Sequence, residues 1–153
     1  MGQQQLLLVI LVTILVGIAT VVAINVFGTA ADQANRDAVR QDLLAGIATA
    51  QALWERPAAM GGFGQAFPTA IDIRRLNIPR GSDLTLDYDI DTIENDNGTY
   101  TVEGSGTGVG SVITITGVPR TGGDEIRATL TRTAVTDGPD GWAITWVEAA
   151  ATP

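Results

Sequence analysis

The feature that most constrains this chain is an uninterrupted apolar run near its amino terminus, LLLVILVTILVGIATVVAINVF, which extends from Leu6 to Phe27. The run contains no charged residue, and its only polar side chains are those of Thr13, Thr20 and Asn25. An α-helix of this length, rising ~1.5 Å per residue, would measure about 33 Å. Because that length matches the hydrocarbon core of a bilayer, the run predicts a helix that needs lipid or other apolar helices around it.

The helical pattern continues beyond this run, but with only one apolar side. Apolar residues recur at spacings of three and four, at Val39, Leu43, Ile47, Ala50 and Trp54, and the stripe is widened by Leu44 and Ala48. Pro57 then stops the helix. We therefore expect one helix from Leu6 to about Arg56, with an apolar membrane or filament-core part in residues 1–28 and an amphipathic continuation in residues 29–57.

The remaining residues, 58–153, are expected to form an antiparallel β head domain. Apolar and polar residues alternate in five segments, which cover residues 84–91, 99–103, 112–116, 126–131 and 142–147. Trp142, Ile144 and Trp146 share one face of the last segment, so both tryptophans are expected in the core. The predicted fold class is α+β, a long N-terminal helix whose amphipathic half packs on a roughly five-stranded antiparallel sheet.

Composition argues against several functional classes. The 153 residues include no cysteine and no histidine, which removes thiolate and imidazole chemistry and disfavours an enzyme. We therefore predict no catalytic residue, no cofactor and no small-molecule substrate. The net charge is −8, and residues 58–153 carry thirteen acidic residues against six arginines. Such a head offers no direct basic patch for nucleic acid.

Two polar motifs are candidate sites, and each has a simpler interpretation. Asp87, Asp89 and Asp91 supply the oxygen ligands that Ca²⁺ prefers, although the wet face of a strand explains the same residues better. No other metal site is predicted. Asn97 begins an Asn-Gly-Thr acceptor sequence for glycosylation, and Asn-Gly is also a common hairpin turn.

A membrane-length helix at the extreme amino terminus, continued by an amphipathic helix on an antiparallel sheet, resembles the type IV pilin and pseudopilin family. The resemblance implies a subunit that is held in the inner membrane and then stacks into a filament, with helices in the centre and heads outside. It also implies processing after Gly2, with Gln3 as the new first residue. Two features of the family are missing. Only Met1 precedes Gly2, where the family usually has a basic leader. No acidic residue occurs before Asp32, whereas the family usually carries a glutamate at the fifth position of the processed chain.

The sequence therefore predicts a structural subunit that polymerises through its N-terminal helix into an extracellular, pilus-like homopolymer at the cell surface. Small residues four apart, Thr13 with Gly17 and Ala19 with Ala23, would allow close helix packing. The expected assembly positions are Leu6, Leu7, Val9, Ile10, Thr13, Ile14, Gly17, Ala19, Val21, Ala23, Ile24 and Phe27. The alternatives are a single-pass membrane anchor that displays a β-domain as a binding module, and a minor pseudopilin of a secretion machine. A cleaved secretory signal is less favoured, because MGQQQ carries no positive side chain.

Overall fold

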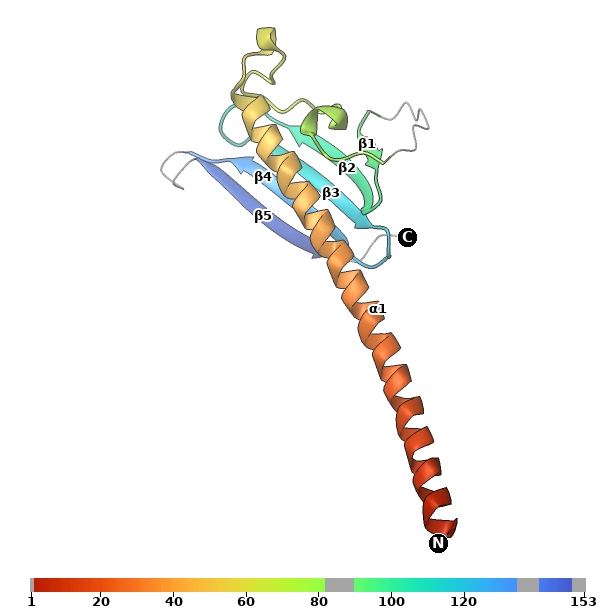
Figure 1. Ribbon diagram of the computed structural model, residues 1–153. Coiled ribbons are helices and arrows are strands. Elements are labelled where there is room, and N and C mark those ends of the chain that lie inside the picture. Colours follow the sequence, from red (N-terminus) through yellow and green to blue (C-terminus); the bar gives the residue numbers. More distant parts are fainter. Residues whose placement is uncertain (1, 82–89, 135–140, 150–153) are drawn as a thin grey trace. The chain divides into compact units, whose positions relative to one another are not determined.

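The structure is a computed structural model that describes residues 2–81, 90–134 and 141–149. It confirms the predicted α+β class (Figure 1). The elements in chain order are the helix α1 (Gly2–Glu55), the short 3₁₀ helices η1 (Ala58–Met60) and η2 (Ile73–Leu76), and the strands β1 (Thr92–Glu94), β2 (Gly98–Ser105), β3 (Val112–Pro119), β4 (Glu125–Arg132) and β5 (Trp142–Ala149). The chain divides into two compact units, residues 1–34 and residues 35–153, and each is described by itself.

In the second unit, the predicted apolar stripe of α1 forms the middle of the core. The side chains of Val39, Leu43, Ile47, Ala50 and Trp54 are all buried. Leu44 and Ala48, which were expected to widen this stripe, are instead exposed. The buried side of α1 is therefore displaced from the predicted stripe, because Asp42, Gly46 and Leu53 are buried instead.

The five strands form one antiparallel sheet in the order β1-β2-β3-β4-β5, as a meander predicts. One face of this sheet is covered by the carboxyl-terminal part of α1 (Figure 1). On that face, Val102, Ile115 and Ala128 stand opposite one another on successive strands and are buried. The opposite face is rich in threonine, and Thr114 and Thr129 lie within hydrogen-bonding distance across it, at 3.2 Å.

A glycine in the central strand lets α1 approach the sheet closely. Gly117 lies opposite Tyr100 on β2 and Ile126 on β4. A Cβ atom at Gly117 would come within 2.7 Å of Cγ1 of Val39 and 3.3 Å of the Tyr100 ring. The missing side chain therefore leaves the space that Val39 of α1 occupies.

The helix ends where Pro57 predicts, and the following connector binds its free carbonyl groups. The backbone N–H groups of Phe63, Gln65 and Gly64 donate to the carbonyl oxygens of Leu53, Trp54 and Arg56, at 2.7, 2.9 and 3.0 Å. These bonds satisfy groups that the end of any helix leaves without an intrahelical partner. The connector thus returns the chain towards the sheet.

One expectation about the strands was wrong, and another falls mostly outside the described residues. The first predicted strand falls mostly on residues outside the described ranges, but Ile90 and Asp91 lie in a turn and β1 begins only at Thr92. In β5, Trp142 packs partly buried against the core, whereas Ile144 and Trp146 are 45% and 41% exposed. The reason is positional, since β5 is the last strand of the sheet and α1 does not cover all of its inner face (Figure 1).

Candidate functional site

The first unit contains α1 from Gly2 to Ala34, and its apolar segment, Leu6–Phe27, is the candidate functional site. Sixteen large apolar side chains in this segment are between 50% and 75% exposed, and all the predicted assembly positions lie within it. A soluble monomer seldom exposes an apolar surface of more than a few hundred Å². The segment is therefore a surface that another apolar body must cover.

The polar side chains of this segment are satisfied within the helix itself. The Thr13 hydroxyl donates to the carbonyl of Ile10 at 2.8 Å, and the Thr20 hydroxyl donates to the carbonyl of Val16 at 2.8 Å. A hydroxyl group taken out of water without a partner costs free energy, and these two bonds reduce that cost. Both threonines can therefore enter an apolar environment with their helix.

Small residues leave little side-chain bulk on two sides of the apolar segment of α1. At 3.6 residues per turn, the pair Thr13 and Gly17 and the pair Ala19 and Ala23 lie about 120° apart around the helix. A Cβ atom at Gly17 would meet nothing within 4 Å in the part of the chain that the structure describes, so no described neighbour requires glycine there. Small residues permit close approach of another helix on each of these sides.

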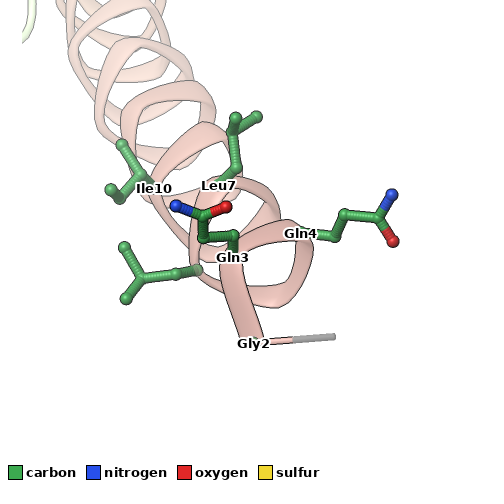
Figure 2. Close-up of a pocket in the computed structure, with 6 residues that line it drawn as sticks. Gly2, Gln3, Gln4, Leu7 and Ile10 are labelled. Carbon is green, nitrogen blue, oxygen red and sulfur yellow. The ribbon is translucent and has the colours of Figure 1, made fainter.

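The predicted processing position lies at the exposed start of α1. Gly2 and Gln3 line a hollow at this end of the helix, together with Gln4, Leu6, Leu7 and Ile10 (Figure 2). The side chains of Gln4 and Ile10 extend from different sides of the helix in Figure 2, so the hollow is an open surface of one helix. Processing at Gly2 and Gln3 stays a prediction.

In the second unit, a buried carboxylate joins α1 to the sheet. Asp42 is 8% exposed, and its Oδ2 atom accepts hydrogen bonds from Tyr100 Oη at 2.6 Å, Asn97 Nδ2 at 2.9 Å and Asn95 Nδ2 at 3.0 Å. Burial, followed by the hydrogen bond to Asp42, raises the pKa of Tyr100 well above its ordinary value. The phenol therefore stays protonated and donates to the carboxylate.

The same network fixes the turn between β1 and β2. Asn95 Oδ1 accepts from the backbone N–H groups of Asn97 and Gly98, at 2.8 and 3.0 Å. The carbonyl oxygen of Asn97 accepts from Asn35 Nδ2 of α1 at 3.0 Å. This explains why an asparagine pair follows β1, since one side chain shapes the turn and both bind α1.

This network also bears on the two motifs named from sequence. Nδ2 of Asn97, the atom to which a glycan would be joined, is occupied by its bond to Asp42, and glycosylation there stays a prediction. Of the calcium candidates, Asp87 and Asp89 lie outside the described residues, while Oδ1 of Asp91 accepts from the Thr92 hydroxyl at 3.4 Å. Within the described ranges, no three acidic side chains come together as a metal site.

A neutral cluster of charges lies where α1 meets the end of β5. Glu148 accepts from Arg36 at 2.7 Å and also from Arg40, which in turn binds Asp37 at 2.6 Å. The hydrogen bond from Arg40 lowers the pKa of Glu148 below its ordinary value and raises that of Arg40. Two acids and two arginines cancel one another here.

The sequence did not indicate the buried network of Asp42, and one of its three donors, Asn97, was named only as a glycosylation candidate. Asp42 lies between Val39 and Gly46 on the buried side of the helix, three residues after the first and four before the second. An acidic residue at such a position indicates that buried hydrogen-bond donors lie nearby. The donors to Asp42, however, come from positions more than fifty residues away in the sequence. Spacing along the helix alone does not identify them.

No protein-family model, curated protein or solved structure matches this chain. The function is therefore inferred from the residues themselves. Among the described residues, α1 is the one helix that is long and apolar enough to cross a membrane. By length and composition it is compatible with membrane anchoring.

Proposed function

We propose that this protein is a structural subunit that is anchored in a membrane through Leu6–Phe27 and then polymerises through that segment into an extracellular, pilus-like filament. The observation that carries the proposal is the exposure of sixteen large apolar side chains on one uncharged helical segment. In the membrane, lipid covers this surface. Outside the membrane, the apolar helices of neighbouring copies cover this surface.

The energetics favour association once the segment leaves lipid. Removing a large aliphatic side chain from water contributes about 1.5 to 3 kcal/mol, and the segment offers many such side chains. Packing only two helices would leave much of each exposed. The small residues on two sides of α1 support contact with more than one neighbour, which a polymer provides and a dimer does not.

The head is suited to the outside of such an assembly. It has its own core, formed by the buried residues of α1 and the sheet, and it carries an excess of acidic residues. The resemblance to type IV pilins and pseudopilins, drawn from the order of these elements, supports the same arrangement. Nothing in the proposal requires a cofactor, a substrate or nucleic acid, and we propose no enzymatic activity.

Electron microscopy of three purified proteins tests the proposal after detergent removal. They are the full chain, a chain that lacks residues 1–28, and the full chain with Val16→Glu, which places a carboxylate among apolar side chains. We expect fibres in negative stain only from the first, because burying an unpaired carboxylate opposes helix packing. Circular dichroism checks that the head is folded in all three.

The other outcomes distinguish the alternatives. Full-length protein that stays in lipid vesicles as isolated molecules, and forms no fibres without lipid, would replace the filament with a membrane-anchored β-domain. Full-length protein that is dispersed as single molecules in detergent-free buffer would contradict both, because neither lipid nor a second copy would then be needed.

A further inference from the structure

Within the described part of the head, apolar side chains are also exposed on the flank of α1 next to β5. Ala128 and Leu130 of β4 are fully buried, and their cross-strand neighbours on β5 are Trp146 and Ile144. Side chains opposite one another in an antiparallel pair lie on the same face of the sheet. Trp146 and Ile144 therefore belong to the inner face, yet they are 41% and 45% exposed.

The adjoining flank of α1 is apolar and exposed as well. Arg40 contacts Glu148 near one end of β5, and the rings of Trp54 and Trp142 are 5.0 Å apart at the other end, so α1 runs antiparallel along β5. Leu44, one turn beyond Arg40, is 49% exposed. We name the surface formed by Leu44, Ile144 and Trp146 the α1–β5 patch.

The outer edge of β5 is as open as this patch. β1, at the other edge of the sheet, has only three residues, and the N–H of Gly81 donates to the carbonyl of its Glu94 at 3.1 Å. β5 has eight residues, and no described strand pairs with its outer edge. Natural sheets usually shorten, charge or cover their edges. The head does so at β1, whereas none of the described strands covers the outer edge of β5.

The occupant of the patch is inferred from the charges beside the patch and from the length of β5. Among the described residues, Arg36, Arg40, Asp37 and Glu148 form a cluster of ion pairs at one end of the patch. Their charges cancel, so an uncharged apolar body can approach this cluster without stripping water from an unpaired charge. β5 is about 26 Å long, at ~3.3 Å per residue. Leu6–Phe27 is uncharged and forms a helix of about 33 Å.

Direct pairing of β5 with β5 of a second copy is the competing arrangement. A two-fold axis perpendicular to the sheet, beside the outer edge of β5 at Thr145, would place Ile144 of one copy opposite Trp146 of the other. That axis also reverses the direction of α1 from one copy to the other. Two antiparallel helices cannot both belong to a filament in which all copies leave one membrane in the same orientation.

We infer that the α1–β5 patch receives the apolar segment Leu6–Phe27 of a second copy, a contact that rests on the proposed function and adds the head to the assembly interface. The segment then packs against α1 of its neighbour as well as against other apolar segments. Trp146 supplies the largest apolar surface of the patch, and the segment of the second copy shields the inner side of β5.

Cysteine cross-linking tests this contact directly, because the natural chain contains no cysteine. Full chains with Trp146→Cys are mixed before assembly with full chains that carry Leu8→Cys, Leu15→Cys or Val22→Cys, and the assemblies are then oxidised. We expect a disulfide-linked dimer of two different chains for at least one of the three positions. Val147→Cys is the matched control, because Val147 is 50% exposed beside Trp146 but on the opposite face of β5.

A second pair of variants measures the energetic importance of the patch. Ile144→Glu places a carboxylate in the patch, and Val147→Glu places one on the other face of the same strand. Because a buried unpaired carboxylate is costly, we expect Ile144→Glu to raise the protein concentration needed for assembly by at least about tenfold. Val147→Glu should leave that concentration nearly unchanged, and both variants should keep a folded head by circular dichroism.

The outcomes separate this inference from the proposed function. Fibres that form normally from Ile144→Glu, or that give no cross-link between Trp146→Cys and any of the three segment positions, would overturn the patch contact while the filament stands. Cross-links only between two Trp146→Cys chains would show edge pairing of β5 instead. Absence of any assembly from the unaltered full chain would contradict the proposed function itself.

Discussion

Asp42 is an acidic residue on the buried side of an amphipathic helix, where an alanine or leucine would complete the apolar stripe. Its carboxylate is held by neutral donors, which are the Tyr100 hydroxyl and the side-chain amides of Asn95 and Asn97. Buried polar groups are tolerated when they are hydrogen-bonded and are costly when they are not. The network thus specifies how the β1–β2 turn meets α1, which apolar packing alone leaves less defined.

Asp42→Ala should lower the free energy of unfolding by about 2 kcal/mol, because the buried Tyr100 hydroxyl and two amides lose their acceptor. The pKa of Tyr100 should fall at the same time, since the hydrogen bond to Asp42 contributes to its rise. Thermal unfolding of the full chain in detergent measures the first effect, and tyrosinate absorbance during an alkaline titration measures the second.

Asp37→Ala is the control for that substitution. The Asp37 side chain is 61% exposed and forms an ion pair with Arg40. Exposed ion pairs contribute less than about 1 kcal/mol, so this variant should unfold close to the unaltered protein. Equal losses from the two substitutions would show that Asp42 contributes nothing through its buried donors.

At the level of elements, α1 and the sheet could be predicted from the periodic spacing of apolar residues. Particular residues show where this spacing no longer predicts burial. The stripe from Val39 to Trp54 was predicted because spacings of three and four place residues on one side of a helix. Strands β2 to β5 were predicted from alternation and turn residues. A period shows which side of an element faces inward, and this determined the packing of α1 on the sheet.

The periodic spacing of apolar residues does not show how much of the sheet α1 covers. Leu44, Ile144 and Trp146 have the spacing of core residues but lie where a single helix no longer covers a five-stranded sheet. Asp42 was missed for a related reason, since its donors come from a distant turn. Candidate surfaces of this kind depend on tertiary placement, whereas the apolar segment Leu6–Phe27 could be recognised from composition alone.

Gly117→Ala tests how closely α1 packs on the central strand. The added Cβ atom would lie 2.7 Å from Cγ1 of Val39, whose β-branched side chain has little rotational freedom in a helix. We expect a loss of about 2 kcal/mol in the free energy of unfolding, as for other overpacked cores. Denaturant unfolding of the full chain in detergent, followed by circular dichroism, measures it.

Two further variants isolate the cause of that loss. Gly28→Ala adds the same methyl group to α1 at a position with nothing within 4 Å, so it should be neutral or slightly stabilising. Combining Gly117→Ala with Val39→Ala should cost less than the two single losses added together, because the second change removes the clash. Strict additivity would mean that Gly117 is required for some reason other than its contact with Val39.

For the whole molecule, charge is divided sharply along the chain. Residues 2–31 carry no charged side chain, whereas residues 58–153 hold a net charge of −7. The first part provides the attraction proposed for assembly, and that attraction is apolar. The second part adds a repulsion between heads, which the locally neutral cluster of Arg36, Arg40, Asp37 and Glu148 does not remove.

Assembly of the full chain should therefore increase with salt. The Debye length falls from ~30 Å at 0.01 M to ~8 Å at 0.15 M ionic strength, so neighbouring acidic heads repel one another far less in the second buffer. We expect the sedimenting fraction after detergent removal to rise across this range and then to level off.

A variant with two fewer exposed acidic side chains is the control. The double variant Glu103→Gln and Asp124→Asn should assemble more readily at low salt and respond less to added salt. Assembly that weakens as salt is added would instead mean that ion pairs between heads hold the filament together, and the apolar segment would then no longer be its main source of stability.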